Sequence, residues 1–223
     1  DDRIKADLLI SIIEQENNYG SFPINSKGSI LLEFVSSNPT GPLHVGHGRH
    51  AAYGDSLAKI LRKAGHAVSC EYYINDSGRQ IDILVLSVLV ALINKKESLL
   101  TTPAACYQGS YIRNLADVIP KQAIKEISKL PLSDLKIKGV DDDSEADALI
   151  STIKDSIGES VFEKITVAVV DKMVKVIKSD LSAFGVEFDH WFSEKTMIKN
   201  SKIDLALKEL KTKNALFEKD GAT

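Results

Sequence analysis

Glu33-Phe-Val-Ser-Ser-Asn-Pro-Thr-Gly-Pro-Leu-His-Val-Gly-His47 decides the fold, because its pattern changes from strand to loop to helix within one short stretch. The apolar run from Ile30 to Val35 predicts a strand, and helix-like sequence follows from about Val45. Pro39 and Pro42 cannot donate to a sheet ladder, so they place a tight loop at the end of that strand. A helix that begins there has unpaired N–H groups, and these attract phosphate.

Two histidines mark the predicted helix start. His44 and His47 are three residues apart, so their imidazoles lie on one side of the first turn if the helix begins near Pro42. Each ring can donate one N–H to a phosphate oxygen. Gly46 has no Cβ and lets a flat ring such as a nucleobase approach the backbone. Two surface histidines at a helix start are the alternative, but the strand and the proline-containing loop before them favour a phosphate site.

The composition is that of an ordinary globular protein. With 223 residues, 43% of them hydrophobic, the chain can form a sizeable core. A net charge of −3 is not the strongly basic balance of a general nucleic-acid binder. Cys70 and Cys106 form no C-x-x-C pair and indicate free thiols in a reducing cytoplasm. The longest apolar stretch, Ile83 to Ile93, is too short to span a membrane, and Asp1 to Lys5 lacks signal-peptide features.

The region from Glu33 to His47, continuing through Gly48-Arg-His-Ala-Ala-Tyr-Gly-Asp55, resembles the signature of arginyl-tRNA synthetases, a family of class I aminoacyl-tRNA synthetases. The H-x-G-H element alone is only moderately specific, because other nucleotidyl-transferring folds carry it. The longer run Ser37-Asn-Pro-Thr-Gly-Pro-Leu-His-Val-Gly-His47 is much more specific. Glu71-Tyr-Tyr-Ile-Asn-Asp-Ser-Gly-Arg-Gln80 also resembles that family.

A second strand and one helix are predicted around this signature. Ala67 to Ile74 alternates between apolar and polar residues and predicts a strand parallel to the first, which gives a βαβ unit. The nearly continuous apolar character of Ile30 to Val35 predicts a central strand covered on both faces. The resemblance implies an α/β fold, the Rossmann-like parallel sheet of class I synthetases with a helical insertion. We expect this fold to be truncated in the chain. On the helix from Val45 to Ala64, the residues expected to face the core are Leu57, Ile60 and Leu61, and Gly65 should end it.

We predict three parts in the chain. Residues 1–94 form an N-terminal helix and the first half of the Rossmann-like catalytic domain. Residues 95–185 form the helical connective insertion that the resemblance implies, because the pattern changes beyond Lys95. Residues 186–223 begin the second half of the catalytic domain, starting with the β-like stretch Val186 to Phe192. The boundaries therefore follow changes in hydrophobic pattern.

The remaining elements follow from periodicity. Asp2 to Glu16 has apolar residues at helical spacing and predicts an amphipathic helix that packs on the body, followed by a cap at Gly20. Arg79 to Asn94 predicts a strongly apolar helix. Further helices are expected near residues 111–119, 121–129, 146–157, 160–184 and 201–213. Ala215 to Gly221 suggests a strand that enters an Asp-Gly hairpin turn. We therefore interpret the chain as a fragment, without the anticodon-binding domain and the signature-lysine loop of the family.

The resemblance implies a reaction and assigns residues to it. The enzyme would activate L-arginine with ATP, accompanied by Mg²⁺, and transfer the arginyl group from arginyl-adenylate to tRNA(Arg). His44 and His47 would be the catalytic residues that contact the phosphates. The implied ATP-binding residues are Thr40, Gly41, Pro42, His44, Gly46 and His47, and the implied arginine-binding residues are Glu33, Ser37 and Asn38.

Several positions keep more than one interpretation. Glu33 is costly to bury without a cation, and a guanidinium of arginine would suit it, but a partly exposed carboxylate or an ion pair with Arg49 or Arg62 is the alternative. Asp76 and Gln80 could line the substrate cleft, and Asp76 could equally cap the following helix. The acidic run at residues 141–145 suits a helix start better than a metal, so we expect no dedicated metal site.

Two alternatives to the ligase remain open on the sequence alone. One is a different H-x-G-H nucleotidyltransferase, which would need neither tRNA nor a carboxylate for a guanidinium. The other is a nucleotide-binding fragment that is inactive by itself. The expected partners are tRNA(Arg), L-arginine and ATP, without a membrane, and the parent enzyme is expected to be a cytoplasmic monomer.

Overall fold

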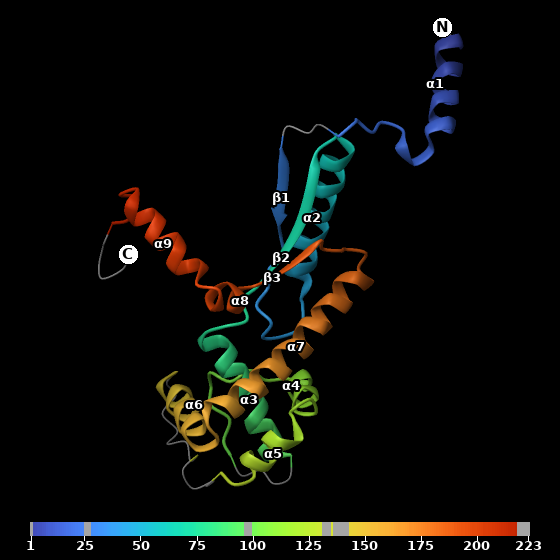
Figure 1. Ribbon diagram of the computed structural model, residues 1–223. Coiled ribbons are helices and arrows are strands. Elements are labelled where there is room, and N and C mark those ends of the chain that lie inside the picture. The colour runs from blue at the N-terminus through green and yellow to red at the C-terminus, as the bar shows by residue number, and fades with distance from the viewer. Residues whose placement is uncertain (1, 25–27, 96–99, 131–134, 136–142, 218–223) are drawn as a thin grey trace.

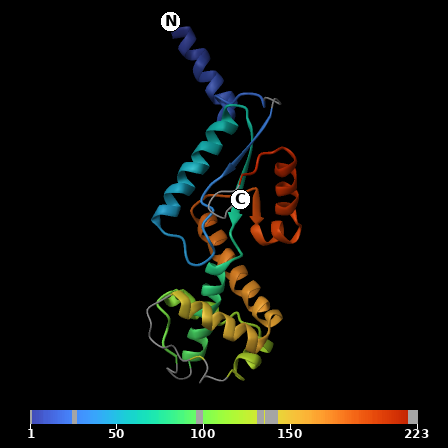
Figure 2. The same ribbon diagram turned by 90° about the vertical axis from the view of Figure 1, so that its left-hand side faces the viewer.

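The computed structural model describes residues 2–24, 28–95, 100–130, 135 and 143–217. Figure 1 shows a small sheet in the middle of the molecule, covered by α2, with a lobe of helices beyond the carboxyl ends of its strands. Helix α7 runs from this lobe back to the sheet, whereas α1 and α9 project from the body. The view turned by 90° also shows α1 apart from the body and the lobe of helices at the opposite end (Figure 2).

The sheet has three parallel strands among the described residues. They are β1 (Ser29–Glu33), β2 (Ala67–Ile74) and β3 (His190–Ser193), in the order β1-β2-β3. Helix α2 (Val45–Lys63) connects β1 to β2 and completes the predicted βαβ unit. The bounds of β2 agree with the prediction, whereas β3 occupies only the end of the predicted β-like stretch. The α/β class with a parallel sheet is confirmed.

One expectation for β1 was wrong. Within the described residues it is an edge strand, not a central one, because only β2 pairs with it. Its residues alternate between exposed and half-buried, and Leu31 is 59% exposed. An apolar run indicates what a strand could bury, but strand order is set by which other segments pair with it.

Helix α2 packs on the sheet through small residues. Ala51, Gly54 and Ala58 are its buried positions, whereas Ile60 is 65% exposed, so the prediction that Ile60 faces the core was wrong. Phe34 fills the space over Gly54, and a Cβ there would lie 2.2 Å from the Phe34 Cγ. Because the helix lies close to the strand, only small side chains fit on the buried face of α2. Gly65 follows the helix with φ +85°, as expected for the residue that ends it.

Among the described residues, five helices form the lobe, close to the predicted positions. They are α3 (Arg79–Asn94), α4 (Ser110–Ala116), α5 (Lys121–Ile127), α6 (Asp143–Ile157) and α7 (Glu159–Ala183). Helix α3 runs through the middle of this cluster and is buried along most of its length. Residues 141 and 142 of the acidic run lie outside the described residues, and α6 begins at Asp143.

Helix α7 joins two cores. Its first half contributes Phe162, Ile165 and Val169 to the core of the helical lobe. Its second half places Ile177 and Leu181 in a second core with residues of β2 and α2. One continuous helix thus packs in both cores, and the cavity described below lies between the lobe and the loop that follows β1.

The two ends of the described chain are less buried than expected. Helix α1 (Asp2–Gln15), followed by the 3-10 turn Glu16–Asn18, has no buried residue and projects away from the body in both views (Figures 1 and 2). The prediction that it packs on the body was therefore wrong. Helices α8 (Glu194–Lys199) and α9 (Lys202–Thr212) follow β3. Residues 215–217 are not a strand, and the rest of the predicted hairpin lies outside the described residues.

Candidate active site

The loop after β1 begins with a strained turn. Val35 has φ +65° and Ser36 has φ +40°, in the left-handed region that a β-branched residue rarely adopts. The Ser36 N–H donates to the Phe34 carbonyl over 2.9 Å, so Val35 is the centre of a γ-turn. This turn ends the ladder and directs the following residues across the carboxyl end of β2. Such strain persists where neighbouring contacts hold it in place.

Tyr72, on β2, supplies such a contact. Its buried hydroxyl accepts from the Ser37 N–H at 3.0 Å and donates to the Ser37 carbonyl at 2.9 Å. Burial raises the pKa of Tyr72 to about 12, so the hydroxyl stays neutral and can make both bonds. The Ser36 hydroxyl accepts from the Tyr73 N–H at 3.1 Å. Side chains thus replace the backbone ladder at the start of the loop.

The two histidines cap α2 reciprocally. His44 is the N-cap, and its Nδ1 accepts from the Gly46 N–H at 3.1 Å. The His47 Nδ1 accepts from the His44 N–H, also at 3.1 Å. The rings stack with centroids 3.8 Å apart. A Cβ on Gly46 would lie 2.9 Å from the His44 Cε1, so glycine is needed here for the cap itself.

These bonds fix the tautomer of both rings. A nitrogen that accepts a hydrogen bond carries no proton, so in the neutral His44 and His47 the proton is on Nε2. Burial, and then the neighbouring His44 and His50, lower the pKa of His47 below its usual value of 6.5. His47 is therefore a neutral donor at pH 7. Each ring can offer one Nε2–H to a ligand without losing its cap.

We predict that His47 titrates below pH 6.5 in an NMR titration of its imidazole. Between the folded and unfolded pKa values the unfolded chain binds more protons. The free energy of unfolding therefore includes this contribution above about pH 6.5 and loses it as the pH falls through the folded pKa. His50→Asn removes one positive neighbour and should shift the pKa of His47 upward. A midpoint at or above 6.5 would show that burial does not lower this pKa, and an unchanged or lower pKa of His47 in the variant would show that His50 does not lower it.

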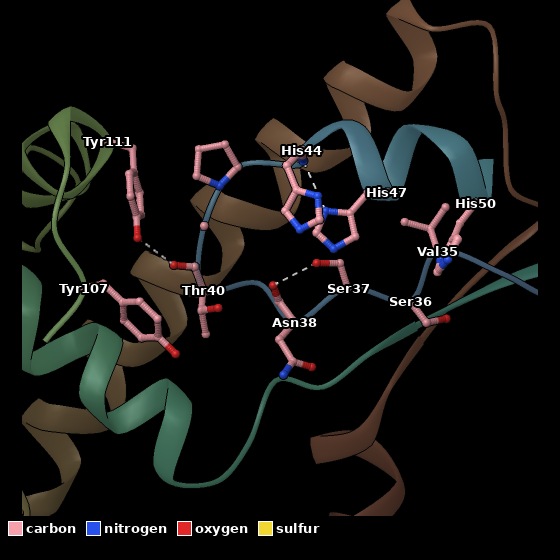
Figure 3. A pocket seen from close by; sticks show the side chains of 12 residues that line it. Val35, Ser36, Ser37, Asn38, Thr40, His44, His47, His50, Tyr107 and Tyr111 are labelled. Carbon is pink, nitrogen blue, oxygen red and sulfur yellow. Dashed lines mark hydrogen bonds between the residues drawn. The ribbon is translucent and has the colours of Figure 1, made fainter. Parts of the chain in front are cut away.

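A cavity of about 600 Å³ lies between the loop and the helical lobe. Figure 3 shows His44 and His47 on one side of it, Tyr107 and Tyr111 on the opposite side, and Asn38 between them. The residues that line it are Val35, Ser36, Ser37, Asn38, Thr40, Gly41, Pro42, His44, His47, His50, Tyr107 and Tyr111. Most of the predicted ATP and arginine residues are thus brought together at one opening.

The second predicted loop meets the first, as expected for strands whose carboxyl ends share one edge. The Asn38 Nδ2 donates to the Gln80 Oε1 at 2.6 Å. Asp76 does not cap α3, whose N-cap is Gly78. It accepts from the Ser193 hydroxyl at 2.6 Å and from the Lys195 N–H at 2.9 Å, so it joins β2 to the start of α8.

Glu33 and Gly46 lie outside the set of cavity-lining residues. Glu33 is an exposed carboxylate at the end of β1, as one of the alternatives expected. Among the described residues it makes no ion pair with Arg49, and Arg62 is paired with Asp189 at 2.9 Å. The structure thus excludes the ion-pair alternatives for Glu33. Its role toward arginine stays a prediction.

Sequence reasoning did not identify the tyrosines of this site. Tyr72 belongs to a strand, where its alternation indicates only a buried ring. Tyr107 and Tyr111 come from the lobe, far from the signature in sequence. The spacing Tyr107-Gln-Gly-Ser-Tyr111, which runs into the first turn of a helix, was the only sequence signal that could have drawn attention to them.

The described residues contain neither a metal cluster nor a membrane-spanning helix. No group of three or more His, Cys, Asp or Glu side chains among them could hold a metal ion. No helix in the described part of the chain is long and apolar enough to cross a membrane. Cys70 and Cys106 are both free and buried.

A parallel βαβ unit, a helix start capped by side chains and a cavity at the carboxyl end of the strands are typical of a Rossmann-like α/β domain. The family "tRNA synthetases class I (R), catalytic domain" matches residues 9–223. The chain belongs to this family. The match does not favour a different H-x-G-H nucleotidyltransferase.

Individual relatives agree with this family. Arginine–tRNA ligase of Dichelobacter nodosus is 38% identical over 226 residues, and the match covers 96% of this chain and 38% of the relative. Arginine–tRNA ligase of Hydrogenovibrio crunogenus is 38% identical over 235 residues, covering 99% of this chain and 39% of the relative. The chain therefore spans about two fifths of the length of these curated relatives.

Solved structures have the same fold. A Campylobacter jejuni protein, solved as a candidate arginyl-tRNA synthetase, superposes with a TM-score of 0.71 at 28% identity, covering 96% of this chain and 41% of that chain. Arginyl-tRNA synthetase of Thermus thermophilus superposes with a TM-score of 0.53 at 23% identity, covering 86% of this chain and 28% of that one. At this lower identity the second comparison supports the fold alone.

Proposed function

We propose that this chain is the ATP- and arginine-binding segment of an arginine–tRNA ligase. The observation that carries the proposal is the pair of imidazoles that cap the start of α2. With each Nδ1 occupied, His44 and His47 can direct their Nε2–H groups into the cavity of about 600 Å³. The membership of the chain in the arginyl class I family supports arginine as the amino acid.

In the proposed reaction the carboxylate of arginine attacks the α-phosphorus of ATP and pyrophosphate leaves. The arginyl group then passes from the adenylate to a terminal hydroxyl of tRNA(Arg), and AMP leaves. Negative charge spreads over the phosphate oxygens in the first step, so hydrogen-bond donors held in place before the reaction stabilise it. His44 and His47 are such donors. Thr40, Gly41 and Pro42 line the same cavity and would surround the nucleotide.

Arginine would bind at the beginning of the loop. Ser37 and Asn38 line the cavity, and the Asn38 amide is oriented by Gln80. Glu33 is exposed, and its carboxylate is paired with no cation among the described residues. A guanidinium could form a bidentate, charge-assisted pair with it. Gly46 supports the nucleotide site indirectly, because His44 rests on it.

The remaining parts of the proposal concern the complete ligase, meaning the natural protein that contains this chain. We propose that ATP binds with Mg²⁺ held by its own phosphates, and that the complete ligase acts as a cytoplasmic monomer. Two free, buried thiols suit a reducing compartment. We also propose that residues 1–94 and 186–223 belong to the two halves of the catalytic domain and that residues 95–185 are the insertion between them. Helix α3, the last element of the first part, packs in the core of the helical lobe.

Thermal unfolding with ligands tests the amino-acid specificity. L-arginine with a non-hydrolysable ATP analogue should raise the melting temperature of the complete ligase, because a ligand at 100 times its Kd stabilises by about 2.7 kcal/mol. Citrulline has the same shape without the positive charge and should protect far less. Equal protection by citrulline, or no arginylation of tRNA by the complete ligase, would contradict the proposal.

A further inference from the structure

Tyr111, on helix α4 of the lobe, reaches the signature loop. Its hydroxyl donates to the Thr40 carbonyl at 3.0 Å (Figure 3). Its ring rests against Gly41, where a Cβ would lie 3.4 Å from the Tyr111 hydroxyl. Burial, with a smaller effect of Tyr107, raises the pKa of Tyr111, so the hydroxyl stays a neutral donor. The lobe therefore makes a directed contact with the loop two residues before Pro42.

The lobe holds Tyr111 firmly. Three residues of α4, Ile112, Leu115 and Ala116, are buried in its core. The segment before α4 is attached to α3 by Ser87, whose hydroxyl accepts from the Tyr107 N–H at 2.8 Å. The buried serine of α3 thus has a defined partner outside its own helix. The donor that meets the loop is preorganised by this packing.

The loop is held from both sides. Tyr72 on the sheet binds Ser37 at its beginning, and Tyr111 on the lobe binds Thr40 near its middle. The His44 cap follows directly after. The Thr40 N–H also donates to the Asn38 carbonyl at 2.8 Å, so a shift of Thr40 would move the backbone of Asn38 as well. The lobe thus contacts the loop four residues before His44.

We infer that Tyr111 is a positioning residue, through which the helical lobe sets the conformation of the Asn38–Pro42 loop and the orientation of His44. This inference rests on the proposed ligase function. The alternative is that the hydroxyl contributes only to folding stability. The two differ in what a variant changes: a positioning role affects the rate of the reaction through His44, whereas a purely structural role affects the amount of folded protein.

The test uses Tyr111→Phe in the complete ligase, with Tyr53→Phe as the matched control. Tyr53 lies on α2, is 73% exposed and does not line the cavity. The kcat of tRNA arginylation and the KM for arginine are measured per folded enzyme. Tyr111→Phe should lower kcat about five- to tenfold, as the loss of one hydrogen bond predicts, and change KM for arginine less than about twofold. Tyr53→Phe should change neither.

A double-mutant cycle separates positioning from stability. In a His44→Ala background, Tyr111→Phe should lower kcat less than about twofold, because the residue it positions is absent. Hydrogen exchange of a peptide that covers Asn38 to His44 should also increase in Tyr111→Phe, and that of β2 should not. A kcat equal to that of Tyr53→Phe, or an undiminished effect without His44, would overturn the inference. An unmutated ligase that does not arginylate tRNA would instead overturn the proposed function, and the inference with it.

Discussion

Replacing His47 with alanine in the complete ligase should slow arginylation of tRNA by about 30- to 1000-fold, and His44→Ala should have an effect in the same range. Each ring supplies one preorganised donor, and such a donor stabilises a transition state by about 2 to 4 kcal/mol. The tautomer of both donors is fixed by backbone N–H groups. They therefore need no reorganisation when charge develops on the phosphates. Initial rates at saturating ATP and arginine measure the effect.

His66→Ala is the control for this prediction. His66 is an exposed histidine just beyond the opposite end of α2, outside the cavity. Its removal should change neither rate nor stability, since surface substitutions usually change stability by less than about 0.5 kcal/mol. A rate for His47→Ala equal to that for His66→Ala would mean that the assignment of His47 is wrong.

His44 also caps α2, so its two roles need separate variants. Asparagine is a good N-cap but is too short to replace the imidazole donor. We expect His44→Asn to recover part of the melting temperature lost in His44→Ala while its rate stays low. If the rate recovered together with the melting temperature, the effect of His44 would come from the cap alone.

The local elements were predictable because their signals lie within a few residues. The alternation of β2 and the apolar run of α3 led to bounds that the structure confirms. The break from strand to proline-containing loop placed the start of α2 at Val45. The residues that begin and end each of these three elements are close in sequence. Their bounds can therefore be predicted without knowledge of the rest of the fold.

The errors concern which surfaces are covered. The apolar residues of α1 and β1 predicted burial, yet Leu8 is 49% exposed and Leu31 is 59% exposed in the described part of the chain. On α2, Ile60 faces solvent and Gly54 faces Phe34. Hydrophobicity shows that a residue can be buried, but the covering surface belongs to another segment, which a single pattern does not identify.

In the site, too, local features were predictable and long-range contacts were not. The histidines, the loop and its meeting with Gln80 follow from motif and topology. The two tyrosine contacts do not, because Tyr72 lies 35 residues from Ser37 and Tyr111 lies 71 residues from Thr40. Nor does the sequence predict that Val35 adopts a positive φ, since a valine is an unfavourable residue there. Long-range contacts hold this conformation, and only the structure identifies them.

Gly54→Ala should destabilise the fold by about 1 kcal/mol, although alanine is the better helix former. Helix propensity alone would favour alanine by about 0.5 to 1 kcal/mol. Against this, the new Cβ would lie 2.2 Å from the Cγ and 2.8 Å from the Cβ of Phe34. These atoms are near the backbone and cannot move by a simple rotation of the ring, so overpacking of about 1 to 3 kcal/mol dominates. Urea unfolding followed through Trp191, the single tryptophan, measures the change.

Gly48→Ala is the matched control, because it lies on the same helix with nothing within 4 Å of an added Cβ. It should be neutral or stabilising by up to about 1 kcal/mol. A smaller side chain at Phe34, as in Phe34→Leu, should recover part of the loss in the Gly54→Ala background if the steric cause is correct. Phe34 is also the residue before the strained Val35, so Gly54→Ala should lower the rate of arginylation as well as stability. Equal stability of the Gly54 and Gly48 variants would show that α2 can move away from β1, and that the loop geometry does not depend on their close contact.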